Sequence, residues 1–326
     1  MAGGIVGYNS VVTTSTDHDV NVAPAVIPRR PMPHVGRVAV IAHQGKTLGG
    51  GLDELRTLLS AEGVDQVIWY EVPKSSKAPA KVRKALKKGA DLLFVWGGDG
   101  MVQQCADALV GSDTTIAIIP AGTANLLAHN LGIPHDLAEA VRISFHGQRR
   151  RLDLGRINGE HFVVLAGVGF DADMIRDADR GLKTRLGRLA YIWTGLRNVG
   201  AHATEVKIKI DGTKWFDGNA SCVLIGNVGT ILGGVQVFDD ARPDDGWLDI
   251  GVTTAEGPVQ WARVVGQIST GNANRSPFIR TTRAKRISIK LGAPLAYELD
   301  GGARPKTRRV KARVVPGGIA VCLPDP

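Results

Sequence analysis

Apolar runs that end at glycine-containing turns, each followed by a helical pattern, organise the first half of the chain. Residues 92–96 are five apolar residues in a row, which indicates a strand buried on both faces, and the turn Gly97-Gly98-Asp99-Gly100 follows directly. Within residues 102–110, apolar side chains recur at helical spacing. This pattern predicts that the glycine turn lies between the carboxyl end of a parallel strand and the amino end of a helix.

A second unit of the same kind follows it. Residues 115–119 form another apolar run, and residues 120–125, Pro-Ala-Gly-Thr-Ala-Asn, lead into an apolar helix at 126–131 that ends at Gly132. In open α/β sheets, ligands bind beyond the carboxyl ends of the strands. We therefore expect both turns to lie at one sheet edge and to contribute to one binding site.

The composition of the first turn indicates phosphate chemistry. Glycine allows backbone N–H groups to approach phosphate oxygens closely, and the dipole of the following helix favours an anion there. A carboxylate at Asp99 would bind Mg²⁺, accept a proton or hold a hydrogen-bond donor. The alternative is an ordinary strand-to-helix turn in which Asp99 only caps a helix.

The beginning of the α/β pattern adds a further candidate loop. Residues 35–42 are predicted to form the first strand, and residues 43–51 form a Gly-rich connection, with the basic side chain of Lys46, into a helix over 52–59. The sequence predicts a phosphate-binding loop here, although the P-loop spacing is absent. The next predicted elements are a strand at 64–72 and a basic helix at 74–88.

From about residue 150 the apolar pattern changes to alternation, which predicts paired antiparallel strands. Asn158-Gly159 and Asp211-Gly212 lie between such strands and favour tight hairpin turns. We therefore expect a mostly β domain of the sandwich type. The predicted strands are 152–156, 161–166, 206–210, 220–225, 247–252, 286–291, 294–299, 308–314 and 319–323, and the predicted helices are 185–199 and 258–269.

Length and cysteine content narrow the class of protein. The 326 residues are enough for two domains, and no apolar run approaches the roughly 20 residues of a membrane-spanning helix. Residues 1–34 lack the pattern of a signal peptide, so we expect a disordered extension there and a cytoplasmic protein. Cys105, Cys222 and Cys322 lie in apolar sequence and indicate buried thiols in a reducing compartment.

The net charge of +9 favours an anionic partner. Arg149-Arg150-Arg151 and residues 304–313 concentrate positive charge, which would attract an anionic membrane surface, a nucleotide or nucleic acid. Solvated faces of strands and loops are the alternative interpretation of these clusters. Sequence-specific nucleic-acid binding is not expected, because no reading module is recognisable.

The two glycine turns resemble motifs of a known family. Residues 97–100 followed by residues 120–125 are similar to the GGDG and P-x-G-T-x-N motifs of the diacylglycerol kinase catalytic-domain family, which includes bacterial lipid kinases and sphingosine kinases. The resemblance implies an open α/β domain, Rossmann-like and NAD-kinase-like, followed by a β-sandwich domain, with the C-terminal strands returning to the first domain. It covers about residues 35–322 and continues through 153–155, 169–172, 243–249 and 300–301.

The resemblance also implies domain boundaries. A disordered extension would occupy residues 1–34, and the nucleotide-binding α/β domain would comprise residues 35–149 together with about 303–326. The β-sandwich domain, on the lipid side, would comprise residues 150–302.

Roles for individual residues follow from the same resemblance. Asp99 and Asp300 are the implied catalytic residues, and a structural Mg²⁺ would be held by the Asp245 carboxylate with the backbone carbonyls of Arg242 and Trp247. The Thr123 hydroxyl is the expected side-chain contact to the nucleotide. The full set of implied ATP contacts is His43, Gln44, Gly45, Lys46, Gly97, Gly98, Asp99, Gly100, Met101, Val102, Gln103, Gln104, Gly122 and Thr123.

The chain departs from the family pattern at several of these positions. Met101 replaces the usual Thr, Gln103-Gln104 replaces Asn-Glu, and Asn125-Leu126 replaces Asn-Asp. Gly302 stands where the family has a Glu that is often assigned as the general base. The base role would then fall on Asp99, on Asp300, or on no residue.

These features together predict an ATP-dependent lipid kinase with Mg²⁺, acting on diacylglycerol at an anionic membrane surface, cytoplasmic and peripheral on the inner face of the membrane. Three alternatives stay open: a NAD kinase, a catalytically silent nucleotide- or lipid-binding regulator, and a kinase of a ceramide, sphingoid or isoprenoid alcohol. No motif sets the oligomeric state, and a homodimer is the expectation from frequency alone.

Overall fold

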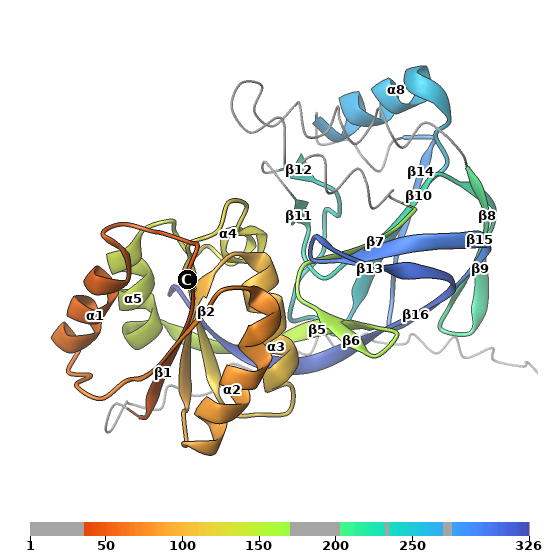
Figure 1. The fold of residues 1–326 in the computed structure, drawn as a ribbon. Helices are drawn as coiled ribbons and strands as arrows, with labels where there is room; N and C mark the ends of the chain where they lie inside the picture. Colours follow the sequence, from red (N-terminus) through yellow and green to blue (C-terminus); the bar gives the residue numbers. More distant parts are fainter. Residues whose placement is uncertain (1–35, 170–202, 232–234, 270–275, 326) are drawn as a thin grey trace, which may run out of the picture.

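The computed structural model describes residues 36–169, 203–231, 235–269 and 276–325. An α/β domain and a β-sandwich domain lie side by side, and a 14-stranded sheet runs through both (Figure 1). The predicted extension at 1–34, the predicted helix at 185–199 and the motif residues 170–172 fall outside the described residues.

The α/β domain is built on four parallel strands. β1 (Val38–His43) pairs with both β2 (Ile68–Val72) and β3 (Leu92–Gly97), and β3 pairs with β4 (Thr115–Pro120), which gives the order β4-β3-β1-β2. All residues of β3 and β4 are buried, as their continuous apolar sequence predicts for central strands of a parallel sheet.

Helices cover both faces of this sheet. α1 (Gly51–Ala61) packs with α5 (Leu137–His146), whereas α2 (Ala78–Lys87) packs with α3 (Asp99–Leu109) on the other side (Figure 1). The basic helix expected at 74–88 begins as the 3₁₀ turn η1 (Ser75–Lys77) and becomes α-helical only where Pro79 can occupy a first-turn position. The short helix α4 (Leu126–Asn130) follows β4.

The β-sandwich domain contains the predicted hairpins. Asn158 and Gly159, and likewise Asp211 and Gly212, have positive φ angles at the two turns, as tight hairpin turns require. Its elements are β5 (Gln148–Ile157), β6 (Glu160–Phe162), β7 (Leu165–Val168), β8 (Thr204–Ile210), β9 (Thr213–Ala220), β10 (Cys222–Gly226), β11 (Thr230–Ile231), β12 (Val235–Gln236), β13 (Leu248–Thr253), α8 (Gly257–Ser269), β14 (Ile279–Ala284) and β15 (Arg286–Leu299).

The last strand, β16 (Gly302–Leu323), joins the two domains. It pairs antiparallel with β15 and β5, and its end pairs parallel with β4 through Ala320 and Val321. The two strands predicted at 308–314 and 319–323 are therefore one strand, interrupted by a bulge between Val315 and Ile319. This confirms the expected return of the C-terminal strands to the α/β domain.

Burial agrees with the expectation for the cysteines. Cys105, Cys222 and Cys322 are free thiols, all buried, and burial raises the pKa of each above its ordinary value. Within the described ranges, no helix is both long and apolar enough to cross a membrane.

Candidate active site

The two glycine turns touch each other through their backbones. A Cβ atom at Gly122 would lie 2.3 Å from the Cα of Gly98, and a Cβ at Gly98 would lie 3.1 Å from the Cα of Gly122. Neighbouring β3 and β4 therefore bring their carboxyl-terminal turns into direct contact, and only glycine at Gly122 permits this approach. The two turns therefore lie at the same edge of the sheet, as the sequence predicted.

Asp99 links the first turn to the second helix. Its Oδ1 accepts a hydrogen bond of 3.0 Å from the backbone N–H of Leu127, in the first turn of α4. Asp99 itself begins α3, after Gly98 as its N-cap, and its side chain is half-buried. Among the described residues, its second oxygen has no hydrogen-bond partner. Asp99 thus caps α4 with one carboxylate oxygen and keeps the other oxygen available for a ligand.

Asn125 fixes the second turn and was not among the predicted site residues. Its φ of 48° is left-handed, and its side chain closes the loop on itself: Oδ1 accepts from the Gly122 N–H at 2.9 Å, and Nδ2 donates to the Pro120 carbonyl at 2.8 Å. The preference of Asn for the left-handed region and for local turn bonds was the available sequence signal. Thr123, two residues earlier, is exposed.

The Gly-rich loop after β1 lies beside the central turn. The N–H of Gly45 donates to Nδ1 of His43 at 3.1 Å, and Trp96 Nε1 of β3 donates to the Lys46 carbonyl at 2.9 Å. A Cβ at Gly97 would lie 3.7 Å from the Cβ of His43. The structure therefore brings His43, Gln44, Gly45 and Lys46 to the same sheet edge, with Gln44 and Gly45 exposed.

Three of the predicted nucleotide contacts have buried side chains. Met101 and Val102 are buried in the α/β core, and their N–H groups both donate to the Gly98 carbonyl, at 2.8 and 3.1 Å. Gln103 is also buried and donates to the His161 carbonyl. Helix geometry leaves the earlier amides, those of Asp99 and Gly100, directed outward for an anion.

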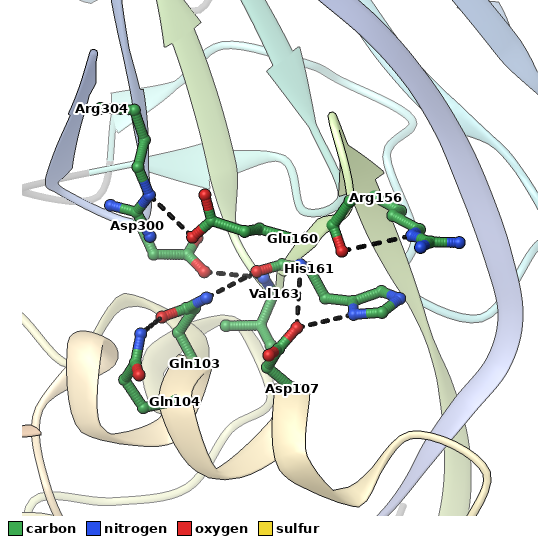
Figure 2. Close-up of polar contacts among 10 residues, drawn as sticks. Gln103, Gln104, Asp107, Arg156, Glu160, His161, Val163, Asp300 and Arg304 are labelled. Carbon is green, nitrogen blue, oxygen red and sulfur yellow. Dashed lines mark hydrogen bonds and ion pairs between the residues drawn. The ribbon is translucent and has the colours of Figure 1, made fainter. Parts of the chain in front are cut away.

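One face of α3 connects the site to the β-sandwich domain (Figure 2). Gln103 Nε2 donates to the His161 carbonyl at 2.6 Å, and Gln104 Nε2 donates to Gln103 Oε1 at 2.7 Å. One turn further along, Asp107 Oδ1 lies 2.7 Å from Nδ1 of His161 and accepts from its backbone N–H. The hydrogen bond from His161 lowers the pKa of Asp107. Gln103 and Gln104 therefore act at the domain junction.

Asp300 enters the junction from the β-sandwich side, after β15 (Figure 2). Its carboxylate accepts three backbone hydrogen bonds, from Val163 at 2.7 Å and from Val164 and Leu165 at 2.9 Å each. Burial, together with the nearby charge of Asp99, raises the pKa of Asp300 to about 7 despite these bonds. Asp300 therefore holds the loop between β6 and β7.

Gly302 lies where the absent family glutamate would stand, and an arginine occupies its space. A Cβ at Gly302 would lie 2.8 Å from Nη1 of Arg304, which donates to the Gly302 carbonyl at 2.9 Å. Arg304 Nε also donates to Glu160 Oε2 of β6 at 2.8 Å (Figure 2). The position therefore carries a guanidinium neutralised by Glu160.

Glu298 is an acid that the sequence analysis did not single out. It lies near the end of β15, on the strand face opposite the buried Tyr297 and Leu299 and two residues before Asp300. Burial and the charge of Asp300 raise its pKa to about 7. No hydrogen-bond partner for its carboxylate occurs among the described residues. Alternation within 294–299 was the signal that could have identified it.

We expect Glu298→Gln to make stability less dependent on pH. A carboxyl whose pKa is raised in the folded state stabilises it below the ordinary pKa of glutamate, and this contribution is lost as the pH rises through about 7. As the pH rises from about 4.5 to about 7, the unfolding free energy of the parent should therefore fall, relative to that of the variant, by on the order of 2 kcal/mol. Urea unfolding at both pH values measures this, with exposed Glu256→Gln as control, and equal pH profiles for Glu298→Gln and the parent would contradict it.

The acidic turn at 242–247 is closed by protein donors. Asp245 Oδ1 accepts from the Trp247 N–H at 3.0 Å, and Oδ2 forms an ion pair with Arg283 at 3.0 Å. Asp153 accepts from the Gly246 N–H at 2.6 Å, and its burial raises its pKa. Because a guanidinium already neutralises Asp245, the turn as it stands does not fit Mg²⁺ well. No group of three or more potential metal-ligating His, Cys, Asp or Glu residues occurs in the described parts of the chain.

Comparisons with known proteins agree with this arrangement. Residues 38–157 match the diacylglycerol kinase catalytic domain, and residues 163–323 match the YegS C-terminal NAD kinase beta sandwich-like domain. The "Diacylglycerol kinase" of Bacillus subtilis (strain 168) is 30% identical over 67% of this chain and 73% of the relative. A Pseudomonas aeruginosa protein, "Probable lipid kinase YegS-like", is 30% identical over 88% of this chain and 94% of the relative.

Solved structures show the same fold. A crystal structure of a diacylglycerol kinase from Bacillus anthracis strain Sterne has a TM-score of 0.71 at 26% identity, covering 88% of this chain and 96% of that one. An NAD kinase from Archaeoglobus fulgidus, at a TM-score of 0.50 and 11% identity, shares the fold alone. The fold thus defines a kinase-type α/β domain joined to an NAD-kinase-like β-sandwich. The chain belongs to the diacylglycerol kinase catalytic-domain family.

Proposed function

We propose that the protein is an ATP-dependent lipid kinase that phosphorylates the hydroxyl of diacylglycerol to give phosphatidic acid. The observation that carries the proposal is the direct contact of the Gly98 and Gly122 turns, beside an Asp99 carboxylate with one oxygen that has no hydrogen-bond partner among the described residues. In this proposal the nucleotide binds to the α/β domain, which the end of β16 joins through Ala320 and Val321, and the lipid binds on the β-sandwich side.

The proposed nucleotide site uses the edge formed by β1, β3 and β4. The outward amides at the start of α3 and the exposed Gln44-Gly45 backbone suit phosphate oxygens, and Lys46 adds positive charge. The Thr123 hydroxyl is positioned for a further polar contact. When MgATP is bound, magnesium supplies neutralisation of the phosphate charge.

Proton removal from the acceptor is assigned to the acidic residues at the junction. In the proposed step, Asp99 orients the lipid hydroxyl and accepts its proton as the oxygen forms a bond to the γ-phosphorus and the bond to the β-phosphate oxygen breaks, which releases ADP. Asp300 acts by holding the loop at 163–165 and by its charge near Asp99. Glu298, two residues before Asp300, is a further acid, and burial raises its pKa to about 7.

A catalytically silent binding protein is the second candidate, and one observation favours it. A glycine stands at position 302, and the Arg304 guanidinium lies beside it, so this position supplies no acid. A protein of this kind would bind ATP without transferring its phosphate. The phosphate-transfer assay described next distinguishes this binding protein from a kinase.

The test is transfer of labelled γ-phosphate from ATP to lipids in mixed micelles. Diacylglycerol, ceramide and sphingosine are offered separately, with NAD in a parallel reaction. We expect product on diacylglycerol. Product on NAD alone would replace the proposal by a NAD kinase, and ATP binding without any product would favour the silent binding protein.

Asp245→Ala tests the role of the acidic turn. We expect its melting temperature to fall by about 2 °C or more, because Arg283 and the Trp247 N–H lose their acceptor. We also expect Mg²⁺ without nucleotide to leave the parent's melting temperature unchanged. Thermal melts with and without Mg²⁺ measure both. A magnesium-dependent rise in the parent that Asp245→Ala removes would restore the metal site implied by the family resemblance.

A further inference from the structure

The outer face of the β-sandwich carries three cross-strand rows of cations. The register places Lys290 of β15 between Lys207 of β8 and Arg309 of β16. In the next row, Ser288 lies between Lys209 and Lys311. In the third, Arg313 of β16 lies between Arg286 of β15 and Arg156 of β5. We call these eight basic residues the cationic face.

The strand alternation separates this face cleanly from the core. Ile208, Ile289, Val310 and Ala312 alternate with the basic residues and are buried in the sandwich core. The basic side chains are exposed, with Arg156 half-buried. An open groove of about 650 Å³ crosses the face between the turns Asn158-Gly159 and Asp211-Gly212. β8, β15 and β16 are paired neighbours and thus carry these basic residues on one face of the sheet.

Few carboxylates of the described chain form ion pairs with the cationic face. Lys207 pairs with Glu205 at 2.8 Å, whereas the other seven basic side chains have no ion-pair partner among the described residues. Asp211, at the border, accepts the backbone N–H groups of Lys285 and Arg286. By contrast, Arg283, Arg304 and Arg150 on neighbouring surfaces each have a carboxylate partner.

Such an arrangement opposes folding. Like charges directly opposite each other on neighbouring strands destabilise a sheet, and here Arg313 faces two arginines while Lys290 faces Lys207 and Arg309. Folding does not require this pattern, because polar uncharged residues at the same exposed positions would avoid the repulsion. An external anion that binds across the rows would relieve it.

We propose that the cationic face docks the protein onto an anionic phospholipid surface. The choice of a membrane as the partner rests on the proposed function, because a diacylglycerol acceptor resides in a bilayer. A broad sheet face with dispersed cations suits a planar array of anionic headgroups, since each Lys or Arg near such a surface adds attraction. The rows contain no aromatic side chain for base stacking, which distinguishes them from a platform for single-stranded nucleic acid. Self-association through this face is opposed by its own charge.

The test measures binding of the full chain to vesicles by co-sedimentation. One set of vesicles contains phosphatidylcholine alone, and the other contains phosphatidylcholine with phosphatidylglycerol. We expect binding to the anionic vesicles, weakened by salt, and little binding to the neutral ones. The variant Lys209→Glu/Arg286→Glu/Lys311→Glu should bind the anionic vesicles at least ~10-fold more weakly.

A matched control tests whether binding depends on the position of the reversed charges or only on the net charge of the protein. Arg83→Glu/Lys84→Glu/Lys87→Glu reverses three exposed cations on α2, in the α/β domain, and should retain binding. Equal loss in both triple variants, or undiminished binding by the β-sandwich triple, would overturn the proposal. Preference for double-stranded DNA over anionic vesicles in competition would also overturn it.

Two further measurements keep the result interpretable. The milder Lys209→Gln/Arg286→Gln/Lys311→Gln variant should also bind more weakly, with a thermal melt at or above that of the parent, so lost binding does not reflect unfolding. Transfer to a soluble short-chain diacylglycerol should be unchanged by all three triple variants. Vesicle binding by a parent that phosphorylates no lipid would retain the docking surface and reject the kinase proposal.

Discussion

Asp99→Asn abolishes phosphoryl transfer, with kcat at least about a thousand-fold lower, if Asp99 has the role proposed for it. The amide oxygen of asparagine can still accept the Leu127 N–H, so the link between α3 and α4 is kept. What the substitution removes is the negative charge and the capacity to take up a proton. The measurement is kcat on diacylglycerol in mixed micelles, together with ATP affinity and a thermal melt.

The control is a second exchange of aspartate for asparagine away from the site. Asp65→Asn removes an exposed carboxylate between α1 and β2 and should leave kcat unchanged. A near-normal kcat for Asp99→Asn would reduce Asp99 to the cap of α4. A large loss of melting temperature would show that its charge, and not only its oxygen, is structural.

Asp300→Ala should destabilise the fold on the order of 3 kcal/mol. The substitution leaves the N–H groups of Val163, Val164 and Leu165 without their acceptor in a largely desolvated loop, and each unsatisfied group carries a cost. Because this loop connects β6 to β7 beside α3, we also expect transfer to be lost. Urea unfolding and the mixed-micelle assay measure the two effects.

Asp300→Asn distinguishes structure from chemistry. Its remaining oxygen can accept the Val164 and Leu165 N–H groups, whereas its Nδ2 faces the Val163 N–H as a second donor, so only part of the stability should return. Recovery of activity along with stability would make Asp300 a positioning residue. An unfolding free energy for Asp300→Ala equal to that of the parent would contradict the proposed clamp.

The sequence predicted the parts of the site that depend on local patterns. Apolar runs locate β3 and β4, and parallel strands that are neighbours must end at one edge, so the contact of Gly98 with Gly122 follows from adjacent units. The hairpins at Asn158-Gly159 and Asp211-Gly212 are likewise local, because two consecutive positive φ angles demand such residues.

Contacts between distant segments were not predictable in this way. Gln103 lies on the buried side of α3 because His161, 58 residues later, supplies the carbonyl it binds, and no periodicity identifies that partner. The same limit applies to the cationic face, since basic residues on β8, β15, β16 and β5 become neighbours only through strand register.

The residues Pro316-Gly317-Gly318 show how a turn signal can mislead. They divide the predicted strands 308–314 and 319–323, yet the chain continues in one direction through them as a bulge in β16. Gly317 has a φ of 56°, and its N–H donates to Oδ1 of Asp153 at 2.7 Å. A distant buried carboxylate therefore converts a local turn signal into a bulge.

The position of β16 has a consequence for the order of folding during synthesis. In the sheet it lies between β15 and β4, although the ribosome makes it after every other strand described. Until it emerges, β4 has an unpaired edge, and β5 lacks its long partner. Neither domain can complete its sheet alone, so the nascent chain should reach its native state in a late, concerted step and should depend on protection of the β4 edge until then.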